Sequence, residues 1–348
     1  MLKKILKCWL SWLLLIFTVL YFTLIPVRGI IGPVELPADD AFLPEEDVQW
    51  WYWTGHLETE EGRKFGYEIV FFTFDSFIFF KDQLIQGAIT DVQDDSFHFD
   101  EHLRTFSLPE KLPNQFKLSS GDGNQITAIG GNGSDTLHSE IGDYVLDLKL
   151  ESTKEPVIHY SGGPHPYRFG GFTYYYSRAA MKTTGTISIK GETFKVTGSS
   201  WFDRQYGELY QAIFQGWQWF AIELDNNTQI MLYDFNGEKN SIEKYASVTG
   251  PDGKTRDLGP DEFTVTDLGE WKSPHTGCTY PSSWKVNVED KEWIINPMVK
   301  DQELRAQHSL WVGPEYWEGA SYVTNPDGSS AGKAYVELNG YCRELISD

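Results

Sequence analysis

Hydrophobic and polar residues alternate with a period of two over much of the chain. In YVLDLKL, Leu146, Leu148 and Leu150 alternate with Asp147 and Lys149. Successive side chains of a strand point to opposite faces, so this pattern predicts a strand with one buried face. Helical periodicity is scarce after the N-terminal segment, and we therefore expect a fold built from β-strands.

Two hairpins are predicted where alternating segments flank a turn. The first is TISIKGETFKV, which turns at Lys190–Gly191, and the second is WKVNVEDKEWII. Turn motifs such as SGDGN, GGNGS, GPDGK and NPDGS separate other strands, and the chain contains 32 glycines. Many short strands between glycine-rich turns are typical of all-β sandwiches and barrels.

One pattern occurs twice along the chain. WWYWTGHL is followed after a short turn by FGYEIVFFTF, and GWQWFAIEL is followed by QIMLYDF. Each unit has a Trp-x-Trp strand that ends at Leu, then a polar turn, then an apolar strand. We therefore predict two related β-domains in tandem, residues 40–212 and 213–348, in which Trp51 and Trp217 occupy equivalent positions.

The first 32 residues form a separate segment. MLKKILK carries three lysines, and an apolar run follows from Cys8 to Ile25. A helix of that length spans roughly 27 Å, close to the roughly 30 Å of a hydrocarbon core. Since basic residues stay in the cytoplasm, residues 8–25 are predicted to anchor the protein in a membrane, with the rest outside the cytoplasm, in the periplasm or extracellular space. A cleaved signal peptide is the alternative, but no small-x-small cleavage motif follows the run.

Charge and cysteine content narrow the possible classes of protein. The formal net charge of −21 disfavours binding to nucleic acid, because phosphate contacts need Lys and Arg. Aromatic residues make up 15 % of the chain, enough for a core and an aromatic-lined cavity. Cys278 and Cys342 would face an oxidising compartment, where they could form a disulfide or remain separate thiols.

Six motifs in order resemble the AttH/CrtC family of lipocalin-like proteins. They are WWYWTGHL, YYYSRAAM, VTGSSWFDRQYG, GWQWFAIELDNNTQIMLYDF, YWEGA and YVELNGY, spread over residues 45–345. The family includes predicted secreted hydrolases, carotenoid 1,2-hydratases (hydroxyneurosporene synthases) and, more distantly, Diels–Alder cyclases. The resemblance implies two calycin-type β-barrels and an apolar small-molecule ligand in a cavity with walls of aromatic rings. No cofactor is expected.

Asp203 is the predicted proton donor. It follows Trp201 by two residues in SSWFDRQYG, so the alternation of a strand places both side chains on one face. A carboxyl group beside an indole in an apolar pocket has a raised pKa and can protonate an alkene, while aromatic rings stabilise the resulting cation. The carotenoid hydratases resemble this segment in having Asp two residues after an aromatic residue. Asp203 could instead pair with Arg204 or cap the turn before Tyr206.

Further candidates come from the neighbouring motifs. The carotenoid hydratases have a His-x-Trp pair where this chain has Tyr174 and Tyr176. The missing His argues against carotenoid hydration itself, although Tyr176 could orient a water molecule or a ligand oxygen. Arg178 could hold an anionic or carbonyl group, or pair with Asp203 or Glu318. Glu318, in YWEGA, is the second candidate acid.

The predicted site thus has a catalytic set and a binding set. The catalytic set is Asp203, Tyr176 and Glu318. The residues predicted to bind substrate are Trp51, Trp53, Tyr174, Arg178, Trp201, Tyr206, Trp217, Trp219, Tyr233 and Trp317, although core packing explains the tryptophans equally simply. The histidines are scattered, which gives no metal site, and no G-x-S-x-G motif supports a serine hydrolase.

The predicted function is that of an exported, membrane-anchored protein acting on an apolar polyunsaturated substrate, isoprenoid or polyketide-like. The reaction is an acid-assisted hydration, dehydration or cyclisation, since each needs a shaped apolar cavity and a placed acid. The alternative is a non-catalytic carrier of an apolar ligand, built on the same barrels.

Overall fold

The structure, a computed structural model, describes most of the chain. The described ranges are 32–77, 80–107, 112–121, 123–209, 215–236, 241–305 and 315–342. Residues 8–25, where the membrane anchor is predicted, lie outside these ranges. Within the described ranges, no helix is long and apolar enough to cross a membrane.

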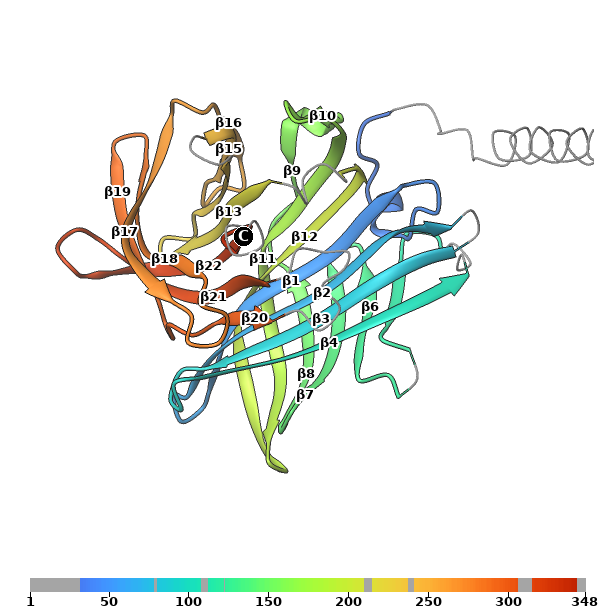
Figure 1. Ribbon diagram of the computed structural model, residues 1–348, viewed down its shortest axis with the longest axis horizontal. Coiled ribbons are helices and arrows are strands. Elements are labelled where there is room, and N and C mark those ends of the chain that lie inside the picture. Colours follow the sequence, from blue (N-terminus) through green and yellow to red (C-terminus); the bar gives the residue numbers. More distant parts are fainter. Residues whose placement is uncertain are drawn as a thin grey trace, which may run out of the picture.

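The first half of the described chain forms a curled antiparallel sheet (Figure 1). Its strands are β1 (Val48–Thr59), β2 (Lys64–Phe77), β3 (Phe80–Asp91), β4 (Ser96–Ser107), β5 (Phe116–Ser119), β6 (Ile126–Gly131), β7 (Ser134–Ile141), β8 (Tyr144–Ser152), β9 (Val157–Ile158), β10 (His165–Pro166), β11 (Phe172–Ile189) and β12 (Glu192–Glu208). They pair in the order β4-β3-β2-β1-β12-β11-β8-β7-β6-β5, and β9 and β10 also pair with β11. Two short 3₁₀ helices accompany them, η1 (Ala38–Asp40) and η2 (His159–Gly162).

The second half forms another curled antiparallel sheet. Its strands are β13 (Gly216–Leu224), β14 (Gln229–Asn236), β15 (Ser241–Thr249), β16 (Thr255–Leu258), β17 (Phe263–Lys272), β18 (Thr279–Val288), β19 (Lys291–Pro297), β20 (Glu303–Arg305), β21 (Glu315–Thr324) and β22 (Ser330–Asn339). They pair in the order β16-β15-β14-β13-β22-β21-β19-β18-β17, and β20 also pairs with β21. The all-β prediction is therefore confirmed, and the two curled sheets are consistent with tandem barrels.

Both predicted hairpins are confirmed. Strand β11 ends at Ile189 and β12 begins at Glu192, so Lys190 and Gly191 form the two-residue turn. Both have positive φ, 51° and 87°, which is the conformation that a tight hairpin turn requires and that glycine adopts without strain. The second hairpin joins β18 to β19, with its last pair at Val288 and Lys291.

Each sheet encloses its own hydrophobic core, and a third cluster of buried residues lies between the sheets. Trp51 and Trp53 belong to the N-terminal core, and Trp317 belongs to the C-terminal core. Trp217 packs against the third cluster, with Trp219 inside it. The predicted equivalence of Trp51 and Trp217 is therefore wrong in one respect, because Trp51 faces a core and Trp217 faces the space between the sheets.

The two cysteines of the C-terminal sheet are joined. Cys278, just before β18, forms a disulfide with Cys342, just after β22, across 64 positions of the sequence. The question left open by the sequence is thus answered in favour of the bonded pair. Both residues are buried beside the C-terminal core.

Candidate active site

A cavity of about 150 Å³ lies between the two sheets. We call it the central cavity. Its walls are mostly aromatic and aliphatic, with three carboxyl groups among them. Its lining residues are Val48, Trp50, Tyr52, Val70, Phe72, Leu84, Gln86, Tyr167, Tyr175, Asp203, Gln205, Leu209, Trp217, Trp219, Tyr233, Phe235, Tyr316, Glu318, Glu337 and Asn339.

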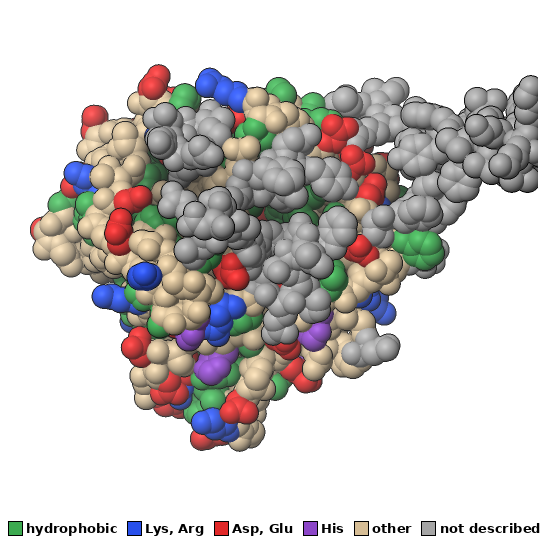
Figure 2. Space-filling model, viewed as in Figure 1, with side chains coloured by type: hydrophobic (Ala, Val, Ile, Leu, Met, Phe, Trp, Pro, Cys, Tyr) green, Lys and Arg blue, Asp and Glu red, His purple; other side chains and the backbone are tan. Residues whose placement is uncertain are grey.

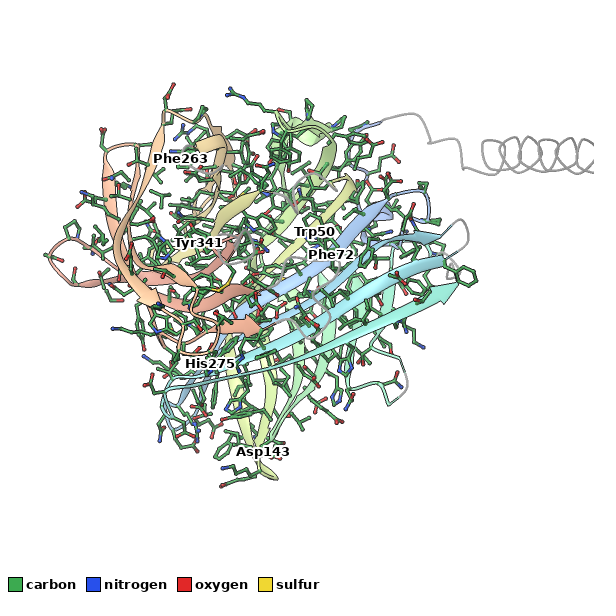
Figure 3. The ribbon with its side chains drawn as sticks, viewed as in Figure 1. Trp50, Phe72, Asp143, Phe263, His275 and Tyr341 are labelled. Atoms are coloured by element: carbon green, nitrogen blue, oxygen red, sulfur yellow. A yellow bond between two sulfur atoms is a disulfide. The ribbon has the colours of Figure 1, made fainter. Side chains whose placement is uncertain are left out.

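Strand β1 is aromatic on both faces because both faces are covered. Trp51 and Trp53 point into the N-terminal core and are fully buried there. Trp50 and Tyr52, which alternate with them, line the central cavity. Trp50 stacks on Phe72 of β2, its cross-strand partner, with ring centroids 5.5 Å apart (Figure 3). One face of β1 thus stabilises a domain, and the other forms a wall of the site.

Asp203 lies on the cavity side of β12 and accepts three hydrogen bonds. The donors are the Tyr175 hydroxyl at 2.5 Å, the Ser177 hydroxyl at 2.5 Å and the Trp201 indole N–H at 2.7 Å. Burial raises the pKa of Asp203 to about 7, because a charged carboxylate loses its hydration there, and the three donors offset only part of the rise. Asp203 therefore holds a transferable proton near neutral pH.

No arginine is paired with Asp203 among the described contacts. Arg178 forms an ion pair with Asp40 at 3.0 Å, and so with neither of its two predicted partners. Arg204 lies on the other face of β12, with its guanidinium 3.9 Å from the ring centroid of Trp51. An adjacent guanidinium would lower the pKa of Asp203 and keep it ionised. Because both guanidinium groups point elsewhere, Asp203 can keep a proton and act as an acid.

Two further carboxyls, both from the C-terminal sheet, face the same cavity. Glu318 of β21 and Glu337 of β22 are cross-strand partners. Tyr52 donates its hydroxyl hydrogen to Glu318. Burial, and then the charge of Glu337, raises the pKa of Glu318 well above its usual range. The pKa of Glu337 is raised to about 7, mainly by burial; the hydrogen bond that Trp217 donates lowers it, and the nearby charge of Asp203 raises it.

Glu68 of β2 completes this group from behind the cavity wall. It is fully buried, and neither of its carboxyl oxygens has a hydrogen-bond partner within the described ranges. Burial raises its pKa well above the usual value, with the charge of Glu337 as the second cause. A buried carboxyl without a donor is more stable in its neutral form than as a carboxylate, which agrees with the raised pKa of Glu68.

The structure separates the predicted site residues into two sets. Asp203, Glu318, Trp217, Trp219 and Tyr233 line the central cavity, and Trp201 supports Asp203 from beside it. The others lie away from the cavity wall. These are Trp51, Trp53, Tyr174, Tyr176, Arg178 and Tyr206, in or beside the N-terminal core, and Trp317, in the C-terminal core.

The reason for this division is the alternation along β11 and β12. Tyr174 and Tyr176 face the N-terminal core, so Tyr175 between them is the residue that reaches Asp203. Tyr176 instead donates to Asp40, at 2.5 Å. On β12 the same alternation turns Tyr206 away from Asp203, where it donates to Asp39 at 2.7 Å.

Several residues of the site were not predicted, namely Tyr52, Tyr175, Ser177 and Glu337. The alternation along β12 places Gln205 on the same face as Asp203 and so predicts that it lines the cavity. It does not predict which residues of the neighbouring strand β11 lie beside Asp203. Ser177 is the cross-strand partner of Asp203, and this pairing is set by a register that the sequence of one strand does not contain. Glu337 could have been identified from the sequence, because an acidic residue within an apolar strand such as YVELNGY is unusual.

A metal site has little support in the described part of the chain. The group of metal-ligating side chains close enough to share an ion is Cys278, Glu303 and Cys342, and its two thiols are consumed by the disulfide. Acidic side chains are spread over the face seen in Figure 2, in keeping with the net charge of −21. A strongly negative surface does not favour nucleic acid.

Comparison with known proteins places this architecture among relatives. The family model described as AttH-like matches residues 30–341. A crystal structure of a protein from Nitrosomonas europaea assigned to AttH is similar, with 28% identity and a TM-score of 0.80, over 89% of this chain and 98% of that chain. Kievitone hydratase from Nectria haematococca has the same fold at 17% identity and a TM-score of 0.67, over 89% and 93%. None of the curated proteins matches the chain.

Proposed function

The chain belongs to the AttH-like family, and on that premise we propose that it is a hydro-lyase of the hydratase type. Its substrate is an apolar polyunsaturated molecule, isoprenoid or polyketide-like, bound in the central cavity. The observation that carries the proposal is Asp203, a buried carboxyl with a pKa of about 7 among aromatic rings. Kievitone hydratase has a similar fold, which supports the view that this architecture can host a hydration reaction.

The first step is protonation of the substrate. Asp203 transfers its proton to one carbon of an alkene, whose π electrons form the new C–H bond, and the other carbon becomes a cation. The rings of Tyr52, Tyr175 and Trp219 line the cavity and stabilise that cation through their π-electrons. Tyr52 and Trp219 pack edge to face with centroids 5.5 Å apart, so their positions are fixed before the cation forms.

The second step is addition of water. A water oxygen forms a C–O bond with the cation and loses one proton to Glu337. The negative charge that Asp203 acquires in the first step raises the pKa of Glu337, so Glu337 becomes a stronger base when a base is needed. The reverse sequence is a dehydration. Capture of the cation by a second alkene of the substrate is a cyclisation, which uses the same acid and ends when the new cation loses a proton to Glu337.

The test is incorporation of oxygen from labelled water. The purified full-length protein is incubated with its co-purified ligand, or with polyunsaturated isoprenoids, in oxygen-18 water, and products are identified by mass spectrometry. Asp203→Asn should lower the rate by about 10²–10⁴-fold, the usual contribution of a general acid, while binding of the ligand persists. Unchanged incorporation in Asp203→Asn would show that another group is the acid.

A carrier is the second candidate, because the lining of the cavity is largely apolar and would hold a hydrophobic ligand without any reaction. A co-purified lipid that stays chemically unchanged after long incubation supports the carrier.

We also propose that residues 8–25 anchor the protein and that both β-domains lie outside the cytoplasm. The buried disulfide supports that location, because disulfides persist in oxidising compartments.

A further inference from the structure

A chain of hydrogen bonds leads from Asp203 through the protein to an exposed residue of the C-terminal sheet. Ser177 donates to Asp203 at 2.5 Å, and Nε2 of His159 lies 2.8 Å from the Ser177 hydroxyl. Nδ1 of His159 lies 3.4 Å from the Tyr245 hydroxyl, which donates to Asp257 at 2.6 Å. Asp257 is exposed, whereas His159 is fully buried. We infer that this chain is a proton relay that connects Asp203 with solvent, and that His159 is its central residue.

The relay crosses from one domain to the other. His159 belongs to η2, beside β9, and Tyr245 and Asp257 belong to β15 and β16. Figure 1 shows β9, β15 and β16 in the upper part of the molecule. The rings around the histidine are packed closely: its centroid is 4.2 Å from that of Tyr175 and 5.8 Å from that of Tyr245. Such packing excludes bulk water from the surroundings of His159, so protons that take this path move through the side chains themselves.

The chemistry of His159 suits transfer in either direction. Burial lowers the pKa of His159 to about 3, so the imidazole is neutral, with one N–H and one free lone pair. With the hydrogen on Nε2, the ring donates to Ser177 and has a free lone pair at Nδ1. Once Asp257 takes up a proton, it can donate that proton to the Tyr245 oxygen, and Tyr245 then passes its own hydrogen to Nδ1. Each transfer moves one proton along the chain and leaves every intermediate group in its original charge state.

The backbone around His159 is held in a costly conformation. Tyr160 and Ser161, which follow it in η2, have φ of 55° and 58°, values that non-glycine residues rarely adopt. Contacts with the other domain maintain this conformation, since the Tyr160 hydroxyl donates to that of Tyr233 at 2.8 Å. Strain that surrounding structure maintains is found at functional sites, and here it sets the position of the imidazole between the two hydroxyls.

The role of the relay in turnover, but not the relay itself, rests on the proposed function. Hydration leaves Asp203 ionised and Glu337 protonated. One proton entering at Asp257 restores Asp203, and one proton leaving Glu337 for the solvent balances it. The relay therefore resets the acid without passing a proton through the apolar substrate.

Hydrogen exchange of the Asp203 carboxyl tests the relay without any substrate. The purified full-length protein, at about pH 6 where most Asp203 carries its proton, is mixed rapidly with D₂O. The carbonyl stretch of protonated Asp203, identified by its loss in Asp203→Asn, is followed by infrared spectroscopy. Tyr245→Phe should slow the exchange at least about tenfold, because it removes the hydroxyl that His159 faces.

Tyr280→Phe is the matched control, since it also removes a buried hydroxyl that donates to a carboxylate, Glu303, but outside the relay. It should leave the exchange unchanged. His159→Asn is a second break in the same chain and should also slow the exchange, with folding checked by thermal unfolding. Unchanged exchange in both Tyr245→Phe and His159→Asn would overturn the relay and mean that protons reach Asp203 through the cavity. Because exchange needs no turnover, this result is independent of the Asp203→Asn activity test.

Discussion

Tyr52 and Glu318 join the two β-domains by a hydrogen bond between residues 266 positions apart. The Tyr52 hydroxyl on β1 donates to the Glu318 carboxyl on β21 at 2.9 Å, and both residues line the central cavity. Burial and the neighbouring carboxyls raise the pKa of Glu318, whereas this bond lowers it. The protonation of Glu318 is therefore linked to how the domains dock.

Tyr52→Phe should lower the free energy of unfolding by about 1–2 kcal/mol, since a buried acceptor loses its donor. The pKa of Glu318 should rise further, and stability should then fall more steeply as the pH is raised. Chemical denaturation over a pH series measures both effects. Tyr67→Phe is the control, because its hydroxyl bonds to Ser200 within the N-terminal core. The same pH dependence in both variants would contradict the prediction.

The stability of the protein should fall as the pH rises from about 4 to about 7. Asp203 has a pKa of about 7 in the folded protein and about 4 in the unfolded chain, so the folded state binds the proton more tightly. The stabilisation is complete below pH 4 and is lost as the pH passes 7. Asp203→Asn stays neutral and lacks this loss. At pH 8 the variant should be more stable by up to about 4 kcal/mol, measured by denaturant titration. Lower stability of the variant at pH 8 would contradict the burial of Asp203.

Trp201→Phe should move the pH dependence of turnover to higher pH. The indole N–H of Trp201 donates to Asp203 and lowers its pKa, so its removal raises that pKa and keeps the acid protonated at higher pH. Rates measured over a pH series would show the shift. Trp53→Phe is matched, since Trp53 donates to Asp135 at 3.0 Å inside the N-terminal core. An equal shift in both variants would mean that the effect is general.

Glu337→Gln should reduce turnover by about 10²–10⁴-fold, because water then has no base to which it can lose its proton. Binding of the ligand should persist, as glutamine has nearly the same shape. Glu223→Gln is the control: burial also raises the pKa of Glu223, but this residue lies outside the cavity lining. Full activity of Glu337→Gln would assign the role of base to another group.

The sequence predicted the strands and the apolar surroundings of Asp203 better than it predicted the walls of the site. Trp201 and Asp203 share a face because alternation along one strand is a local property, and the structure has them hydrogen-bonded. When both faces of a strand are apolar, alternation does not show which face meets the domain core and which lines the cavity. For this reason Trp51 and Trp53 were predicted for the cavity that Trp50 and Tyr52 line.

Residues from other strands could not be predicted in the same way. Tyr174 and Tyr176 were selected because they stand where the carotenoid hydratases have a His-x-Trp pair. That Tyr175 is the residue that meets Asp203 depends on the register between two strands, which the sequence does not show. His159 could not be identified from the sequence, because a single histidine in the segment HYSGG belongs to no periodic pattern or known motif. Its place beside Ser177 follows from the pairing of β9 with β11 and from contacts with the second sheet.

In the proposed mechanism the acid belongs to one sheet and the base to the other, and this has an evolutionary consequence. Asp203 belongs to the N-terminal sheet and Glu337 to the C-terminal sheet, so neither repeat carries the chemistry alone. A gene duplication that produced the tandem would have had to diverge in the faces that meet. New substrates can then arise through small changes in the angle between the domains, which alter the separation of acid and base without replacing either. Diversity within such a lineage should be found at the seam between the repeats.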